Sequence, residues 1–361
     1  MRELTKQALY DILNGCAIAG TGGGGSLSEG LELIDRGLAD GGVFKLAALD
    51  ELPDDGVIGV PYCCGALTSQ ENNPLAHYPE LSEPLGVLAA QAMERYLGRG
   101  FAGFMSTELG GANTAQAFYT AAAMGRPIVD ADPAGRSVPE LQHSTFFLHD
   151  IPITPMAVAD AYGNSAIIDK VVNDERAEHW ARALAVASNN TVGVLDHPAK
   201  VSEIRGAVIE GAISYAEKLG AALRMAKASG EDTAQAVIDA GKGKRLFDGV
   251  VTLAEFEDRD GFTFGTIVLS GEKSYSGHEY KIWYKNENII SRLDGEIHVT
   301  VPDLICMLDE FGDQQVNPLV KAGQRFTVFA LPAPAQWTTK RGLECFGPRS
   351  FGFDVDYRPV V

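Results

Sequence analysis

The chain has 361 residues, of which 45% are hydrophobic and 22% are charged, proportions typical of a globular protein rather than of a disordered or fibrous one. This length allows two or three domains. Asp and Glu outnumber Lys and Arg by 48 to 30, and the net charge of −18 repels phosphate backbones and anionic lipid, which argues against nucleic acid and membranes as partners.

The N-terminal segment and the cysteines predict the cellular compartment. Glu3, Lys6 and Asp11 interrupt the apolar stretch that an export signal needs, so we expect a cytoplasmic protein. The uncharged stretch 109–125 contains polar side chains that lipid does not accept unpaired. The five cysteines are scattered without a CxxC pair, which predicts free thiols rather than disulfides or a structural zinc site.

The first part of the chain alternates helical and strand patterns. Apolar spacing predicts a helix over 4–13 that ends at Gly15, and Ser26 with Glu29 forms a capping box that opens a second helix. Further helical patterns and short apolar runs then alternate, at 43–47, 57–62, 84–97, 101–105, 112–124 and 128–129. This alternation predicts an α/β domain, layered as an α/β/α sandwich, over residues 1–168.

The remainder, residues 169–361, is predicted to be a second domain that is helical at first. Helical patterns cover 174–187, 202–228 and 232–240. From about residue 245 the chain consists of β-rich runs punctuated by Gly, Asp and Asn turns, which predicts a β-barrel or β-sandwich.

A glycine run at residues 20–25 formally spells GxGxxG before the helix that Ser26 caps. A dinucleotide site needs a strand directly before such a run, but a helix precedes this one, and the Lys-Ser/Thr pair of a phosphate loop is missing. Two interpretations remain: an active-site loop that binds a small anion through its amides, or a flexible turn between two helices.

Polar segments follow two of the apolar runs. The segment 61–73 contains Cys63 and Cys64, of which Cys64 is a possible nucleophile, although free cysteines are more often small buried hydrophobes. Glu108 follows the run 101–105 and is placed to act as an acid, a base or a metal ligand, or simply to cap the next helix. Ligands of α/β sheets bind at such strand ends.

The densest polar segment is 130–143, which follows the run 128–129. Two carboxylates, Asp130 and Asp132, are followed there by Arg136, Glu140 and His143, a combination that provides both charge and proton chemistry. The alternative is an Asp-Pro turn fixed by an Arg–Asp pair. A divalent metal such as zinc could bind a histidine here, but no HExxH spacing is present. The segment 286–288 has the composition of a polar turn.

These segments resemble a bacterial family named for S-methyl thiohydantoin desulfurase. The matching motifs are TGGGG, ELGGAN, DADPAGRSVPELQ, NENI, VPDLI and GPRSFGFDVDY, in the same order along the chain. The resemblance implies an α/β domain followed by a β-rich one, and the hydrolytic loss of a sulfur substituent from a hydantoin-type ring in the catabolism of histidine and ergothioneine derivatives. Members are often associated with hydantoinase and oxoprolinase genes.

The resemblance also implies site residues, whose individual roles we infer. Catalytic roles are expected for Glu108, Asp130, Asp132 and Glu140, and substrate binding for Gly22, Gly23, Gly24, Gly25, Glu71, Asn113, Arg136 and Gln142. The candidates for a metal ligand are Glu108, Asp130 and His143. The chain departs from the family pattern at 65–68, and Cys63 and Cys64 are not part of that pattern.

Two other functions remain open at this point. The protein could be a non-catalytic partner subunit of a hydantoinase-type or oxoprolinase-type enzyme, or a sensor that binds the ring without turnover. An accessory subunit should expose large apolar patches when it is isolated. A homo-oligomer is the common default for such enzymes.

Overall fold

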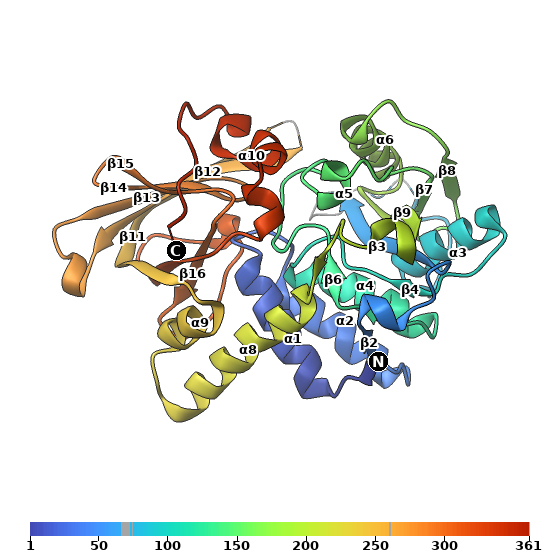
Figure 1. The fold of residues 1–361 in the computed structure, drawn as a ribbon, viewed down its shortest axis with the longest axis horizontal. Helices are drawn as coiled ribbons and strands as arrows, with labels where there is room; N and C mark the ends of the chain where they lie inside the picture. The colour runs from blue at the N-terminus through green and yellow to red at the C-terminus, as the bar shows by residue number, and fades with distance from the viewer. Residues whose placement is uncertain (66–72, 74, 260, 361) are drawn as a thin grey trace.

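The computed structural model describes residues 1–65, 73, 75–259 and 261–360. Figure 1 shows an α/β region, coloured blue to yellow-green, beside a β-rich region in orange and red. Three short helices and several 3-10 turns complete the two regions. The short helices are α5 (Thr145–Leu148), α7 (Val201–Ile204) and α10 (Lys340–Phe346), and the 3-10 turns are η1 (Leu49–Glu51), η2 (Lys273–Tyr275), η3 (Asn317–Leu319), η4 (Ala335–Thr338) and η5 (Pro348–Phe351).

The α/β region is built on a mixed eight-stranded sheet. Its order is β1 (Arg2–Glu3), β2 (Lys45–Ala47), β5 (Ile128–Val129), β4 (Gly103–Phe104), β3 (Val57–Gly65), β9 (Thr191–Lys200), β7 (Met156–Ala159) and β8 (Ser165–Ile168). Strands β2, β5, β4 and β3 are parallel to one another, whereas the remaining pairings are antiparallel. The carboxyl ends of the four parallel strands therefore lie along one edge of the sheet.

Five longer helices belong to this region. They are α1 (Lys6–Ala19), α2 (Leu27–Ala39), α3 (Leu85–Leu97), α4 (Gly111–Ala123) and α6 (Asp174–Ala187). Helices α3, α4 and α6 pack on the sheet, whereas α2 packs on α4, and α1 packs on α8 (Ala212–Ser229), α2 and α4. The Ser26 hydroxyl accepts a hydrogen bond from the amide of Glu29, as the capping motif predicts. Buried side chains of α1, α3 and α4 share one core with one face of the sheet, and alanines of α6 share a second core with the other face.

Helix α1 does not end at Gly15 as predicted but continues to Ala19. The reason is its close crossing with α8 (Ala212–Ser229): a Cβ atom at Gly15 would lie 1.8 Å from the carbonyl oxygen of Ala216, and one at Gly220 equally close to that of Asp11. Glycine thus allows two helices to approach, instead of ending one of them.

The predicted helix over 202–228 is also interrupted. The structure has the single turn α7, then β10 (Ile209–Glu210), and only then α8. Gly206 and Gly211 both have positive φ, which breaks the helix on either side of β10. Strand β10 pairs with β6 (Ala131–Asp132) and so holds the segment after β5 in place.

The β-rich region is one antiparallel sheet of seven strands. Its order is β15 (Glu296–Thr300), β14 (Glu287–Leu293), β13 (Glu279–Lys285), β12 (Phe262–Gly271), β11 (Lys244–Arg259), β17 (Arg325–Leu331) and β16 (Leu304–Asp309). Its own core contains Phe247, Tyr280 and Tyr284. The prediction of a β-rich part from about residue 245 is confirmed, whereas the predicted β-barrel or β-sandwich is not: the described strands form a single sheet with edge strands β15 and β16.

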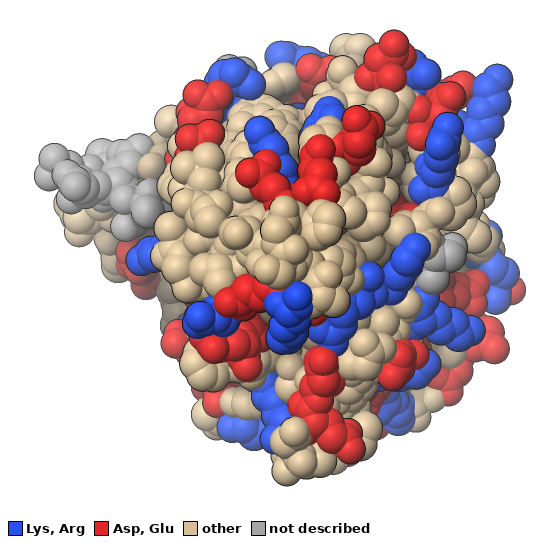
Figure 2. All heavy atoms as spheres, turned by 90° about the vertical axis from the view of Figure 1, so that its left-hand side faces the viewer, with Lys and Arg blue, Asp and Glu red and all other residues tan. Residues whose placement is uncertain are grey.

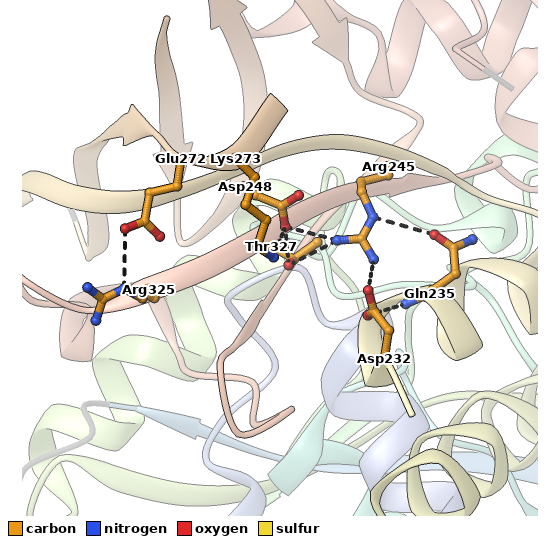
Figure 3. A network of polar contacts seen from close by, with 8 residues as sticks. All are labelled: Asp232, Gln235, Arg245, Asp248, Glu272, Lys273, Arg325 and Thr327. Carbon is orange, nitrogen blue, oxygen red and sulfur yellow. Dashed lines mark hydrogen bonds and ion pairs between the residues drawn. The ribbon is translucent and has the colours of Figure 1, made fainter. Parts of the chain in front are cut away.

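Helix α9 (Thr233–Gly241) is fastened to this sheet by a polar network that centres on Arg245 of β11 (Figure 3). The Arg245 guanidinium lies 2.6 Å from a carboxylate oxygen of Asp232 and 2.9 Å from one of Asp248. The Thr327 hydroxyl of β17 donates to the same Asp248 oxygen at 2.6 Å. The network joins a helix to two strands and is structural in character.

The two regions share a core. Leu304, Cys306 and Phe329 of the β-rich sheet pack in the same cluster as buried side chains of α1 and α8. The prediction of an α/β region followed by a β-rich region is therefore confirmed in outline, whereas the strict three-layer sandwich is not confirmed. Among the described residues, none of the helices combines the length and the apolar character needed to cross a bilayer.

Candidate functional site

The edge formed by the carboxyl ends of the parallel strands carries two of the predicted carboxylates. Glu108 follows β4, and Asp132 lies in β6 directly after β5. Both side chains are buried. A third buried carboxylate, Glu287 at the start of β14, comes from the β-rich region, and its pKa is raised by the charge of Glu108 as well as by burial. We call Glu108, Asp132 and Glu287 the acidic cluster.

Arg136 is the cation of this site and is completely buried. Its five N–H groups donate to neutral oxygens: the carbonyls of Ser137, Pro302, Asp303 and Asn288, and the hydroxyl of Thr21. Its guanidinium also lies over the ring of Phe346, 5.0 Å from the centroid. Burial lowers the pKa of Arg136 to about 10, so the side chain stays cationic at neutral pH and ties the two regions together.

Glu108 is held in one orientation by its hydrogen bonds. The Asn113 amide donates to Oε1 at 2.7 Å, and the backbone N–H of Val138 donates to Oε2 at 2.8 Å. Burial raises the pKa of Glu108 to about 7, although both hydrogen bonds and the charge of Arg136 favour the carboxylate. Near neutral pH, Glu108 therefore exchanges readily between its protonated and ionised forms.

Asp132 uses one carboxylate oxygen and leaves the other without a protein partner. Oδ1 accepts from the backbone N–H of Gly135 at 2.7 Å, whereas Oδ2 is buried and makes no hydrogen bond with a described residue. Burial raises the pKa of Asp132 to about 8, and the charge of Glu108 acts in the same direction. At neutral pH, Asp132 is mostly protonated and can donate a proton.

Glu287 was missed by the sequence analysis, which interpreted 286–288 as a polar turn. In the structure it begins β14, and its Oε2 is buried without a hydrogen-bond partner among the described residues. Burial and the charge of Glu108 hold the pKa of Glu287 well above its ordinary value. The available signal was the pair Ile289 and Ile290 directly after Glu287 and Asn288, which is compatible with the start of a strand but does not show that the acid is buried.

The glycine loop is packed against this cluster. A Cβ atom at Gly23 would lie 1.9 Å from Oε1 of Glu287, and one at Gly24 would lie 2.1 Å from the Ser137 hydroxyl. The carbonyl of Gly24 accepts from the N–H groups of Ala112 and Asn113, and the carbonyl of Gly22 from that of Asn317. These contacts with both regions show why a run of glycines is needed, and they contradict the interpretation as a flexible turn.

Glu140 and Gln142 lie on the segment that follows. Glu140 forms an ion pair with Lys285 of β13, and its other oxygen accepts from the Gln142 amide at 2.5 Å. The Lys285 ammonium also lies over the ring of Phe262, 4.0 Å from its centroid. This group is about 15% exposed, so it forms the solvent side of the contact between the two regions.

Two further predicted residues are used elsewhere. Asp130 accepts hydrogen bonds from the backbone N–H and the hydroxyl of Ser214, at 2.9 and 2.5 Å, and so caps the first turn of α8. His143 is buried between the rings of Phe346 and Phe351, and burial lowers its pKa to about 3, which leaves the imidazole neutral.

The metal candidates do not form a ligand set. Glu108 is bound by Asn113 and Val138, Asp130 caps α8, and His143 lies between two phenyl rings. Within the described ranges, no group of three or more His, Cys, Asp and Glu side chains is arranged to hold a metal ion. We therefore derive no step through a metal.

The remaining predictions concern the end of β3. Burial raises the pKa of Cys63 to about 12 and that of Cys64 to about 11, so both are protonated thiols and poor nucleophiles at neutral pH. Glu71 lies outside the described residues.

Comparison with known proteins agrees with this architecture. Two family models match the chain: S-Me-THD-like, N-terminal domain, over residues 7–170, and S-Me-THD-like, C-terminal domain, over residues 172–360. A crystal structure of a protein from Chromobacterium violaceum superposes with a TM-score of 0.77 at 23% identity and covers 100% of both chains, a likeness of fold. A search of curated proteins gave no match.

Proposed function

Because the chain belongs to the S-Me-THD-like family over both of its domains, we propose that it hydrolyses the carbon–sulfur bond of an S-methyl thiohydantoin or a related hydantoin-type ring. The observation that carries this proposal is the acidic cluster, in which Asp132 and Glu287 each keep a buried carboxylate oxygen without a hydrogen-bond partner among the described residues, in a site that also contains the buried Arg136. Such pairing of perturbed carboxyl groups is typical of acid–base sites.

The reaction is a substitution at the ring carbon between the two nitrogens. The oxygen of water forms a bond to this carbon, and the bond to sulfur breaks. One proton of the water goes to the departing sulfur, which leaves as methanethiol, and the other remains on the ring nitrogen of the hydantoin product. A general acid that protonates the ring nitrogen or the sulfur lowers the barrier, because charge then does not accumulate on the ring.

Asp132 is suited to be this acid. It is protonated at neutral pH because burial raises its pKa to about 8, and its free Oδ2 is the oxygen that can donate. Glu108, with a pKa of about 7, is suited to take a proton from the attacking water. Two buried carboxyl groups with separate pKa values provide an acid and a base in one site.

Arg136 does not have the substrate-binding role that the sequence analysis expected. All five of its N–H groups are used by protein oxygens, so it does not clamp a substrate carboxylate. Its fixed charge favours the ionised form of Glu108. We assign the binding of an anionic group of the substrate to the backbone amides of the Gly22–Gly25 loop.

The test is turnover with product identification. Purified protein is incubated with an S-methyl thiohydantoin in water labelled with oxygen-18, and both thiol and hydantoin are quantified. The proposal predicts equal amounts of methanethiol and hydantoin, with one labelled oxygen in the new ring carbonyl. Thiol release without the label, or no release at all, contradicts it. Metal content of the same sample is measured by mass spectrometry.

A second candidate function is an accessory subunit of a hydantoinase-type enzyme. Leu253 and Phe256 on β11 are 43% and 53% exposed, and Phe311 is 71% exposed. Figure 2 shows, on the outer side of the β-rich region, an uncharged area bordered by charged side chains. This function predicts activity only after such an enzyme is added, whereas the first predicts turnover by the chain alone.

A further inference from the structure

A buried histidine interrupts β9 outside the acidic cluster. Between Ile58 and Val60 the register of β3 and β9 shifts, so Gly59 alone lies opposite His197 and Pro198, a β-bulge. His197 has φ +43°, a conformation that residues other than glycine seldom adopt. Bulges and positive φ values are concentrated where the chain directs a side chain toward a functional site.

The imidazole of His197 is fixed by its neighbours. Nδ1 lies 2.8 Å from Oδ1 of Asp196, and the Tyr62 hydroxyl donates to the other oxygen of Asp196 at 2.9 Å. The ring stacks on Phe146 with 4.7 Å between the centroids. His197, Asp196 and Tyr62 are all at least nine-tenths buried, so the three side chains form a closed polar chain inside the protein.

This arrangement determines what Nε2 can bind. The Asp196 carboxylate accepts the proton of Nδ1, so Nε2 of the neutral ring carries a lone pair. Nε2 is buried and has no hydrogen-bond partner among the described residues. A buried acceptor without a partner is costly, and a ligand that brings a donor removes this cost.

The position of His197 links it to the acidic cluster. The backbone N–H of Thr145, the first residue of α5, donates to the carbonyl of Pro133 at 2.6 Å, next to Asp132. The following residue, Phe146, carries the ring that stacks on His197. Two adjacent residues of α5 therefore connect the segment of Asp132 with the ring of His197.

We propose that Nε2 of His197 is the acceptor of a second binding site, which takes a small ligand through an N–H or O–H donor. Resting on the proposed function, we identify this donor as a ring N–H of a hydantoin-type molecule. The site requires a donor and therefore discriminates between a ring with free N–H groups and the same ring with both nitrogens methylated.

The test uses nuclear magnetic resonance on the full chain with nitrogen-15 in its histidines. Hydantoin is added in one titration and 1,3-dimethylhydantoin, which has no ring N–H, in another. His143 provides an internal comparison: it is equally buried and its Nδ1 also lacks a hydrogen-bond partner among the described residues, but it packs against Phe346 and Phe351 and has no carboxylate that fixes its ring. The His197 signal is assigned by its loss in the His197→Asn variant, since asparagine tolerates positive φ.

The inference predicts that hydantoin shifts Nε2 of His197 in a saturable manner, that 1,3-dimethylhydantoin binds at least tenfold more weakly, and that His143 does not move. Equal shifts with both compounds, or no shift of His197 with hydantoin, would overturn it. Turnover without a His197 shift would leave the proposed function intact, and a shift without thiol release would refute only that function.

Discussion

Replacing Asp132 by Asn should change how the stability of the protein depends on pH. Asp132 is completely buried, and its pKa rises from 3.8 to about 8 because burial penalises the charged form. Between about pH 4 and pH 8 the folded state therefore holds a proton that the unfolded chain has already released. Since the folded state binds more protons, the free energy of unfolding falls as the pH rises through this range. Asn keeps the acceptor for Gly135 and cannot ionise.

The magnitude follows from the size of this pKa shift. At 1.36 kcal/mol for each pKa unit, ionisation of Asp132 removes roughly 3 kcal/mol of unfolding free energy between pH 5 and pH 8. Between these pH values the wild type should therefore lose roughly 3 kcal/mol more than Asp132→Asn. Glu108 and Glu287 shift in the same direction, so a smaller loss should persist in the variant.

Urea unfolding at pH 5, 6, 7 and 8, followed by tryptophan fluorescence, measures this difference. The Trp337 indole donates to the carbonyl of Ala134 at 2.7 Å, so its emission reports on the loop that contains Asp132. The matched control is Asp130→Asn, which weakens the cap of α8 by about 1 kcal/mol and should keep the wild-type loss between pH 5 and 8. If Asp132→Asn loses as much stability as the wild type, the argument from burial is wrong.

Four further outcomes are expected. Gly23→Ala should destabilise the fold by about 1–3 kcal/mol, because the new Cβ would collide with Glu287. In the control Gly41→Ala the Cβ meets no atom within 4 Å, so the positive φ alone should cost about 1 kcal/mol. Equal urea midpoints for the two variants would contradict this. Arg136→Met should reduce stability by about 3–5 kcal/mol, measured in the same way, because it leaves buried carbonyl oxygens without donors. Cys64→Ser should release methanethiol at the wild-type rate, because the Cys64 thiol is protonated at neutral pH. A large fall in this rate would indicate that Cys64 acts as a nucleophile. Activity should fall as the pH rises above about 8, where Asp132 loses its proton, and a flat pH–rate profile would contradict its role as an acid.

Much of the α/β region could be predicted because its signals are local. Apolar periodicity and the Ser26 cap gave α2, α3, α4 and α6 to within a few residues. Placing polar segments after strands led to Glu108 and Asp132, since the carboxyl ends of parallel strands meet at one edge of a sheet. Local composition does not encode helix crossings, so Gly15 was mistaken for the end of α1.

The parts that escaped prediction depend on contacts between distant segments. Glu287 joins the acidic cluster because β14 packs against the glycine loop, more than 260 residues earlier in the chain. The orientation of the His197 ring depends on the bulge opposite Gly59, which arises from the pairing of β3 with β9. Asp130 and Asp132 are equivalent in the sequence, and only the position of α8 makes one a helix cap.

The central claim is that Asp132 supplies a proton in hydrolysis of the carbon–sulfur bond. The most direct measurement is kcat/KM for methanethiol release from an S-methyl thiohydantoin at pH 7, by the wild type, Asp132→Asn and the control Asp130→Asn. We predict a loss of about 100-fold to 10,000-fold in Asp132→Asn, as expected for a general acid, and near wild-type turnover in Asp130→Asn. An unchanged kcat/KM in folded Asp132→Asn would contradict the claim.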